Sequence, residues 1–118
     1  MNKQHVQAAV RALDSKKAVN IKIIEIEKLT TLADCFIICN GTSSTHVRTL
    51  ADECEAAMDA IAHPVIHREG MDAGSWILLD YGDMIVHIYN REARAFYDLE
   101  RFWKDGTELS TEEFLENK

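Results

Sequence analysis

The sequence is poor in the residues that make linkers: it has one proline, Pro64, and five glycines among 118 residues. It also has no internal repeat and no low-complexity tract. This length is enough for one ordinary domain and too short for two. With 47% hydrophobic and 28% charged residues, the composition is typical of a globular protein rather than a disordered one. These features predict a single globular domain.

Long hydrophobic runs are absent as well, since no segment approaches the roughly 20 apolar residues that a membrane-spanning helix needs. The N-terminal MNKQHVQAAVRALDSKK has no continuous apolar core, which argues against a secretory signal peptide. An organelle presequence would fit its basic character, but Asp14 and the helical pattern favour an ordinary first helix. Three cysteines, Cys35, Cys39 and Cys54, cannot all pair within the chain. Because each falls in an apolar element, we expect buried free thiols in a reducing cytoplasm. The lack of a membrane-spanning run predicts no membrane contact.

Positive charge is in the minority: 13 Lys and Arg stand against 20 Asp and Glu, which gives a net charge of −7. Binding nucleic acid through its phosphates needs a basic surface, so this balance argues against direct contact with RNA or DNA. It suits a basic protein partner, because opposite fields accelerate the encounter. Solubility alone is an equally good reason for the same acidity.

Motifs for nucleotide binding and nucleophilic catalysis are missing. Residues 40–44 lie between a predicted strand and a predicted helix, where a phosphate could meet free backbone N–H groups. They lack the glycine pattern and the lysine of phosphate-binding loops, so a helix cap explains them better. His46 stands beside Ser43 and Ser44, but no G-x-S-x-G pattern surrounds these hydroxyls. We therefore predict no catalytic residues and no cofactor.

Carboxylates near the predicted turn, and histidines before it, are candidate ligands of a metal ion. Asp80 and Asp83, with Glu69 nearby, offer carboxylates to a divalent ion, but aspartates at a turn more often bond their own backbone. His63 and His67 stand about 13 Å apart if the segment between them is extended, which is too far to share a metal. We therefore predict no metal.

Hydrophobic periodicity predicts an α/β domain with a mixed sheet. In chain order we expect a helix over 2–16, strands over 19–28 and 34–39, a helix up to Pro64, a strand over 64–69, a strand pair over 75–89 and a helix over 90–103. The run DCFIIC is typical of a central strand that is covered on both faces. A slip of phase at Ile23 and Ile24 indicates either a bulge or a change of covering layer. About five strands flanked by helices follow from this order.

The stretch SWILLDYGDMIVHIY, residues 75–89, carries the main functional signal. It predicts two strands joined by a tight turn at Tyr81 and Gly82, or by a turn with a bulge that shifts the pairing by one residue. One face of the pair is wholly apolar and needs a core. The other face mixes aromatic, aliphatic and acidic side chains, as a protein-docking surface does: Trp76, Leu78, Asp80, Asp83, Ile85 and His87. The competing interpretation is that a helix of the same domain covers Trp76.

Two long segments resemble the ribosomal silencing factors, which are also called Iojap-like or YbeB-like proteins. They are DCFIICNGTSSTHVRTLAD and REGMDAGSWILLDYGDMIVHIYNREARAFYDLERFW. The resemblance covers about residues 3–104, and it predicts a family domain over 1–104 followed by an acidic C-terminal tail over 105–118. Ser110 and Glu113 have capping-box spacing, which favours a short helix in that tail.

The resemblance implies a fold similar to the nucleotidyltransferases but without their catalytic carboxylates, and a protein that is not an enzyme. It implies binding to the large ribosomal subunit through ribosomal protein L-fourteen, with little direct RNA contact. Binding there would block association with the small subunit and repress translation under nutrient limitation.

On this basis we expect Trp76 and Leu78 to enter an apolar depression on the partner, and Asp80 and Asp83 to pair with its basic side chains. Tyr81 at the turn tip and His87 would add to the contact. Two alternatives stay open: a nucleotide- or metal-dependent transferase-like enzyme, and a homodimer formed through the exposed strand pair.

Overall fold

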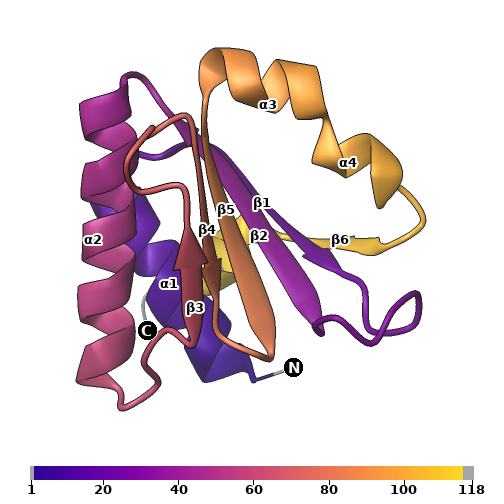
Figure 1. The fold of residues 1–118 in the computed structure, drawn as a ribbon. Coiled ribbons are helices and arrows are strands. Elements are labelled where there is room, and N and C mark those ends of the chain that lie inside the picture. Colours follow the sequence, from indigo (N-terminus) through magenta and orange to yellow (C-terminus); the bar gives the residue numbers. More distant parts are fainter. Residues whose placement is uncertain (1, 116–118) are drawn as a thin grey trace.

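A six-stranded mixed sheet organises the chain (Figure 1). The computed structural model describes residues 2–115, apart from the side chains of residues 96, 97, 99 and 102. The helices are α1 (Lys3–Ser15), α2 (Ser44–Ala60), α3 (Arg91–Tyr97), α4 (Leu99–Phe102) and α5 (Thr111–Leu115). The strands are β1 (Val19–Glu25), β2 (Cys35–Gly41), β3 (His67–Glu69), β4 (Trp76–Asp80), β5 (Met84–Asn90) and β6 (Thr107–Leu109).

The strand order is β3-β4-β5-β2-β1-β6, with β2 and β5 parallel and every other pair antiparallel. This confirms the predicted α/β class and the mixed sheet. The sheet has one strand more than expected, because residues after Lys104 contribute β6.

One face of the sheet is covered by α1 and α2, which lie side by side in Figure 1. The Asn2 side chain caps α1 by accepting from the backbone N–H groups of Gln4 and His5, as the sequence predicts. Ser43 caps α2 in the same way. The apolar stripes of both helices are buried with the inward side chains of β2, β4 and β5 to form the larger core. Among the described residues, no helix is both long enough and apolar enough to cross a membrane.

The other face is covered more sparsely, by the short helices α3 and α4 (Figure 1). Asn90 caps α3 as expected, but the single helix predicted over 90–103 is wrong. Asp98 adopts a left-handed conformation, with φ of 46°, and so separates α3 from α4. Ala93 and Trp103 pack on a smaller core here that includes Phe36 and Tyr89. Because these helices are short, part of this face of β4 is left half-exposed.

The centre of the sheet follows the sequence pattern closely. Every residue of β2 is buried, which confirms the predicted central strand covered on both faces. In β1, Ile23 belongs to the larger core and Ile24 to the smaller one, so the phase slip reflects a change of covering layer. The irregular pairing in β1 lies earlier, between Val19 and Lys22.

The C-terminal segment packs on the domain. Strand β6 pairs antiparallel with β1, and the side chain of Phe114 on α5 is buried in the larger core. The predicted short helix in this segment is present as α5. The division into a family domain over 1–104 and an acidic tail over 105–118 stays a prediction.

A candidate docking face on the hairpin of β4 and β5

The turn between β4 and β5 lies one residue later than predicted, which shifts the cross-strand pairing by two residues. Trp76 pairs with Tyr89 rather than with His87, and Asp80 pairs with Ile85 rather than with Asp83. The loop consists of Gly82 and Asp83, and the Tyr81 N–H donates to the Met84 carbonyl across it at 2.9 Å. Because the pairing shifts by an even number of residues, every residue of β4 and β5 keeps the face that was predicted for it. Asp83, which was predicted to lie on the face of Trp76, lies in the loop instead.

Glycine chemistry explains this turn. Gly82, the first loop residue, has φ of +87°, which suits glycine and would strain other residues. The Asp80 carboxylate accepts a hydrogen bond from the Gly82 N–H at 2.8 Å, so this aspartate does bond the backbone of its own turn.

Three side chains on one face of β4 form the candidate docking face: Trp76, Leu78 and Asp80. All three are half-buried, whereas Ile77 and Leu79 between them are fully buried in the larger core. Nε1 of Trp76 donates to Nδ1 of His87 at 3.2 Å, and the indole stacks on Tyr89 with ring centroids 5.1 Å apart. The Trp76 side chain is therefore partly exposed to solvent, and these two contacts hold its ring in one orientation.

Ile66 is an exposed aliphatic residue beside the turn, and sequence reasoning missed it. Its N–H donates to the Asp80 carbonyl at 2.8 Å, and its side chain is 71% exposed. A Cβ added at Gly82 would lie 3.2 Å from Cδ1 of Ile66, so the isoleucine lies over the turn. The only available signal was an aliphatic residue in an otherwise polar segment after Pro64.

Tyr81 and His87 are buried, which corrects their assignment as partner contacts. Tyr81 is 1% exposed, and its hydroxyl lies 3.8 Å from Sγ of Cys54 inside the larger core rather than at the turn tip. His87 is 4% exposed, and burial lowers its pKa to about 4. The imidazole is therefore neutral at neutral pH. Because Nδ1 accepts from Trp76, the proton resides on Nε2, and His87 positions the indole rather than touching a partner.

Asp83 lies on the opposite side of the hairpin from Trp76 and Leu78. Its Oδ2 is 2.7 Å from Nδ1 of His5 on α1, and its Oδ1 is 3.0 Å from Nε2 of His63, after α2. Burial raises the pKa of Asp83, but the hydrogen bonds from the two imidazoles outweigh it, so the pKa lies below its usual value. We call these three residues the His5–His63–Asp83 cluster. No local sequence pattern indicated this cluster, because its members come from three distant segments.

The three carboxylates considered for a metal do not converge. Asp80 bonds its own turn, Asp83 bonds the two histidines, and Glu69 contacts Nε2 of His67 at 2.7 Å. His63 and His67 likewise have separate partners.

The helix-cap interpretation of residues 40–44 is confirmed. Ser43 accepts from the His46 N–H at 3.0 Å, and Nδ1 of His46 accepts from the Thr42 N–H at 2.9 Å. Nε2 of His46 donates to the Lys16 carbonyl at 2.8 Å, so this histidine joins α2 to the end of α1.

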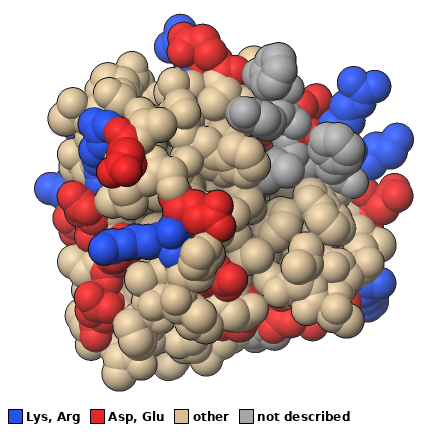
Figure 2. All heavy atoms as spheres, viewed as in Figure 1, with Lys and Arg blue, Asp and Glu red and all other residues tan. Residues whose placement is uncertain are grey.

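The thiols are poor nucleophiles. Cys35, Cys39 and Cys54 are free and buried, as expected. Burial raises the pKa of Cys35 and of Cys54 to about 12, and it raises the pKa of Cys39 further. On the face drawn in Figure 2, Lys and Arg side chains are interspersed with Asp and Glu and form no continuous basic patch. This face is thus unlike a surface that binds nucleic-acid phosphates.

Fold and site together define a small mixed α/β domain with a candidate docking face on its more open side. A family model described as "Ribosomal silencing factor during starvation" matches residues 1–118. The chain therefore belongs to the ribosomal silencing factor family, which confirms the resemblance seen in the sequence motifs.

Individual relatives agree with this assignment. Ribosomal silencing factor RsfS of Bacillus subtilis is 35% identical over 107 residues, which cover 90% of this chain and 91% of the relative. RsfS of Halalkalibacterium halodurans is 32% identical over 111 residues, which cover 94% and 95% of the two chains. A crystal structure of a Chromobacterium violaceum protein matches with a TM-score of 0.85 at 31% identity and covers 93% of this chain and 92% of that one.

Proposed function

We propose that this chain binds the large ribosomal subunit in the cytoplasm through the face formed by Trp76, Leu78 and Asp80, and that its contact there is ribosomal protein L-fourteen. Bound at that position, it blocks association with the small subunit and so represses translation when nutrients are limiting. Family membership supports the ribosomal role. The observation that carries the choice of surface is the alternation along β4, where three half-exposed side chains share one face while Ile77 and Leu79 are fully buried.

The orientation of Trp76 favours binding. Its hydrogen bond to His87 and its stacking on Tyr89 fix the indole before a partner arrives. A side chain that is already ordered loses less conformational entropy on binding, and tryptophan is enriched among residues that dominate interfaces. His87 thus contributes indirectly, as a positioning residue beneath the surface.

Charge selects the kind of partner. Asp80 presents a carboxylate beside the apolar Leu78, and the chain as a whole carries a net charge of −7. A basic ribosomal protein is attracted by this field, whereas the phosphates of ribosomal RNA are repelled. Docking through protein, with little direct RNA contact, follows from this balance.

The mechanism is steric and involves no turnover. Its effect depends on how long the chain occupies the subunit surface, which is set mainly by the dissociation rate. The three thiols and the Tyr81 hydroxyl are buried, and burial keeps them protonated, so none of these four groups is placed to act on a substrate.

Two leucines provide a matched test. Leu78 on β4 and Leu109 on β6 are both half-buried strand residues. Strand β4 lies near one edge of the sheet, and β6 forms the other edge. We expect Leu78→Ala to weaken binding to purified ribosomal protein L-fourteen by about tenfold or more in calorimetry, and Leu109→Ala to leave it unchanged. Equal affinities of both variants and the wild type would remove β4 from the interface.

A further inference from the structure

We propose that the His5–His63–Asp83 cluster is a binding site for a divalent transition-metal ion of the Zn²⁺ type. Among the described residues it is the group in which three side chains with ligating atoms converge, and these atoms all lie within 4.8 Å of one another. The cluster lies on the α1 and α2 side of the hairpin, so the proposal does not depend on the docking face.

The donor set selects the class of metal. Two imidazole nitrogens and one carboxylate suit Zn²⁺, Co²⁺ or Ni²⁺, whereas Mg²⁺ and Ca²⁺ prefer sets made of oxygen atoms. Three protein ligands leave one position of a tetrahedral ion for water. All three side chains are partly exposed, at 21% for His5, 25% for His63 and 23% for Asp83, so solvent can reach that position.

Small movements convert the hydrogen-bonded cluster into a coordination sphere. Nδ1 of His5 and Nε2 of His63 now lie 2.7 Å and 3.0 Å from the two oxygens of Asp83. Around a tetrahedral zinc ion, neighbouring ligand atoms stand about 3.3 Å apart, so each imidazole nitrogen must move about 0.5 Å away from its carboxylate oxygen. The widest spacing among the three ligand atoms, which is now within 4.8 Å, must shrink towards the same value. The two imidazoles are stacked, with centroids 3.8 Å apart, and must rotate until both ligating nitrogens face one point. Each neutral imidazole then carries its proton on the other ring nitrogen.

The backbone around each ligand is held by a hydrogen bond. The His5 N–H donates to the Asn2 cap at 3.3 Å, the His63 N–H donates to the Met58 carbonyl at 3.0 Å, and the Asp83 carbonyl accepts from Asp34 at 2.9 Å. Ligands fixed on rigid elements need little reorganisation when they bind an ion.

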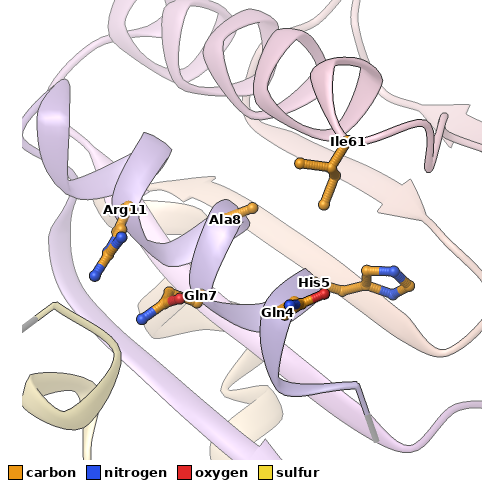
Figure 3. Close-up of a pocket in the computed structure, with 6 residues that line it drawn as sticks. All are labelled: Gln4, His5, Gln7, Ala8, Arg11 and Ile61. Carbon is orange, nitrogen blue, oxygen red and sulfur yellow. The ribbon is translucent and has the colours of Figure 1, made fainter. Parts of the chain in front are cut away.

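A hollow of about 330 Å³ adjoins the cluster through His5. Figure 3 shows that the hollow lies between α1, which contributes His5, and Ile61 at the end of α2. An ion bound to the cluster would connect the start of α1, the end of α2 and the hairpin turn. It would therefore stabilise the folded chain, because the unfolded chain does not assemble the three ligands.

Calorimetry with Zn²⁺ on protein that carries no polyhistidine tag tests the proposal. His63→Ala removes one ligand, and His67→Ala is the matched control, because His67 contacts Glu69 outside the cluster. We expect one ion per chain with a dissociation constant of about 10 μM or lower, a loss of about tenfold or more in His63→Ala, and no change in His67→Ala. Zn²⁺ should raise the melting temperature of the wild type and of His67→Ala but not that of His63→Ala.

Co²⁺ provides a second readout, since a four-coordinate site gives intense visible absorption bands, whereas the solvated ion absorbs only weakly and at shorter wavelength. The proposal is overturned if the wild type shows no saturable binding of Zn²⁺, or if His63→Ala binds as tightly as the wild type. Should circular dichroism show that His63→Ala is unfolded, Asp83→Asn takes its place, because it preserves the size of the side chain. Unchanged affinity in that variant overturns the proposal equally.

Discussion

His87 should make the fold sensitive to mild acid. Burial lowers the pKa of this imidazole from its ordinary value of 6.5 to about 4. In the unfolded chain the group regains its ordinary pKa, so between these two values the unfolded state binds a proton that the native state does not. The stability is therefore complete above the ordinary pKa, and it is lost progressively as the pH falls towards the folded value.

The size of the effect follows from the two pKa values. A difference between 6.5 and about 4 corresponds to about 3 kcal/mol, at about 1.4 kcal/mol for each unit of pKa. At about pH 5, part of the way through this interval, the loss is about 2 kcal/mol. Domains of this kind have free energies of unfolding of about 5–15 kcal/mol, so the loss is a large fraction of the total.

Urea unfolding followed by far-ultraviolet circular dichroism at about pH 7.5 and about pH 5 measures this loss. His87→Gln is the control, because an amide oxygen can still accept the hydrogen bond from Trp76 but does not titrate. Other titrating groups are common to both proteins and cancel in the difference. We expect the wild type to lose about 2 kcal/mol more than the variant on acidification. Parallel losses in the two proteins would show that His87 is not held neutral by burial.

Two further substitutions examine the hairpin. Trp76→Ala should cost about 2 kcal/mol or more of binding to the large subunit while the chain stays folded, as calorimetry and a circular dichroism melt will show; an unfolded variant would instead assign Trp76 to the core. Gly70→Ala should destabilise the fold by about 2 kcal/mol or more in urea unfolding, because the residue has φ of +87° and its new Cβ would lie 1.9 Å from the Trp76 carbonyl oxygen. A wild-type unfolding midpoint in that variant would contradict the backbone geometry at the start of β4.

The sequence predicted best the features that depend on local pattern. The unbroken run of β2 requires apolar cover on both faces, and the structure provides it. The faces of β4 and β5 were predicted although the turn was misplaced by one residue, because side chains alternate with a period of two and the pairing shifted by two residues. The caps at Asn2 and Asn90 rest on side-chain chemistry within a few residues and were predicted for the same reason.

Features that depend on distant neighbours were missed. Periodicity assigns His87 to the correct face, but its burial depends on rings such as Phe36, whose centroid is 4.8 Å from that of His87. Nothing in the local pattern brings His5 to within hydrogen-bonding distance of Asp83, 78 positions away along the chain. The break at Asp98 escaped notice because aspartate tolerates both helical and left-handed conformations.

Co-sedimentation with separated ribosomal subunits tests most directly the claim that β4 docks on the large subunit. Asp80→Lys reverses the charge on the candidate docking face, and Asp52→Lys makes the same change on the exposed side of α2, across the sheet. The wild type and Asp52→Lys should pellet with the large subunit and not with the small one, while Asp80→Lys, shown by circular dichroism to be folded, should stay in the supernatant. Pelleting of Asp80→Lys to the same extent as the wild type would contradict the account.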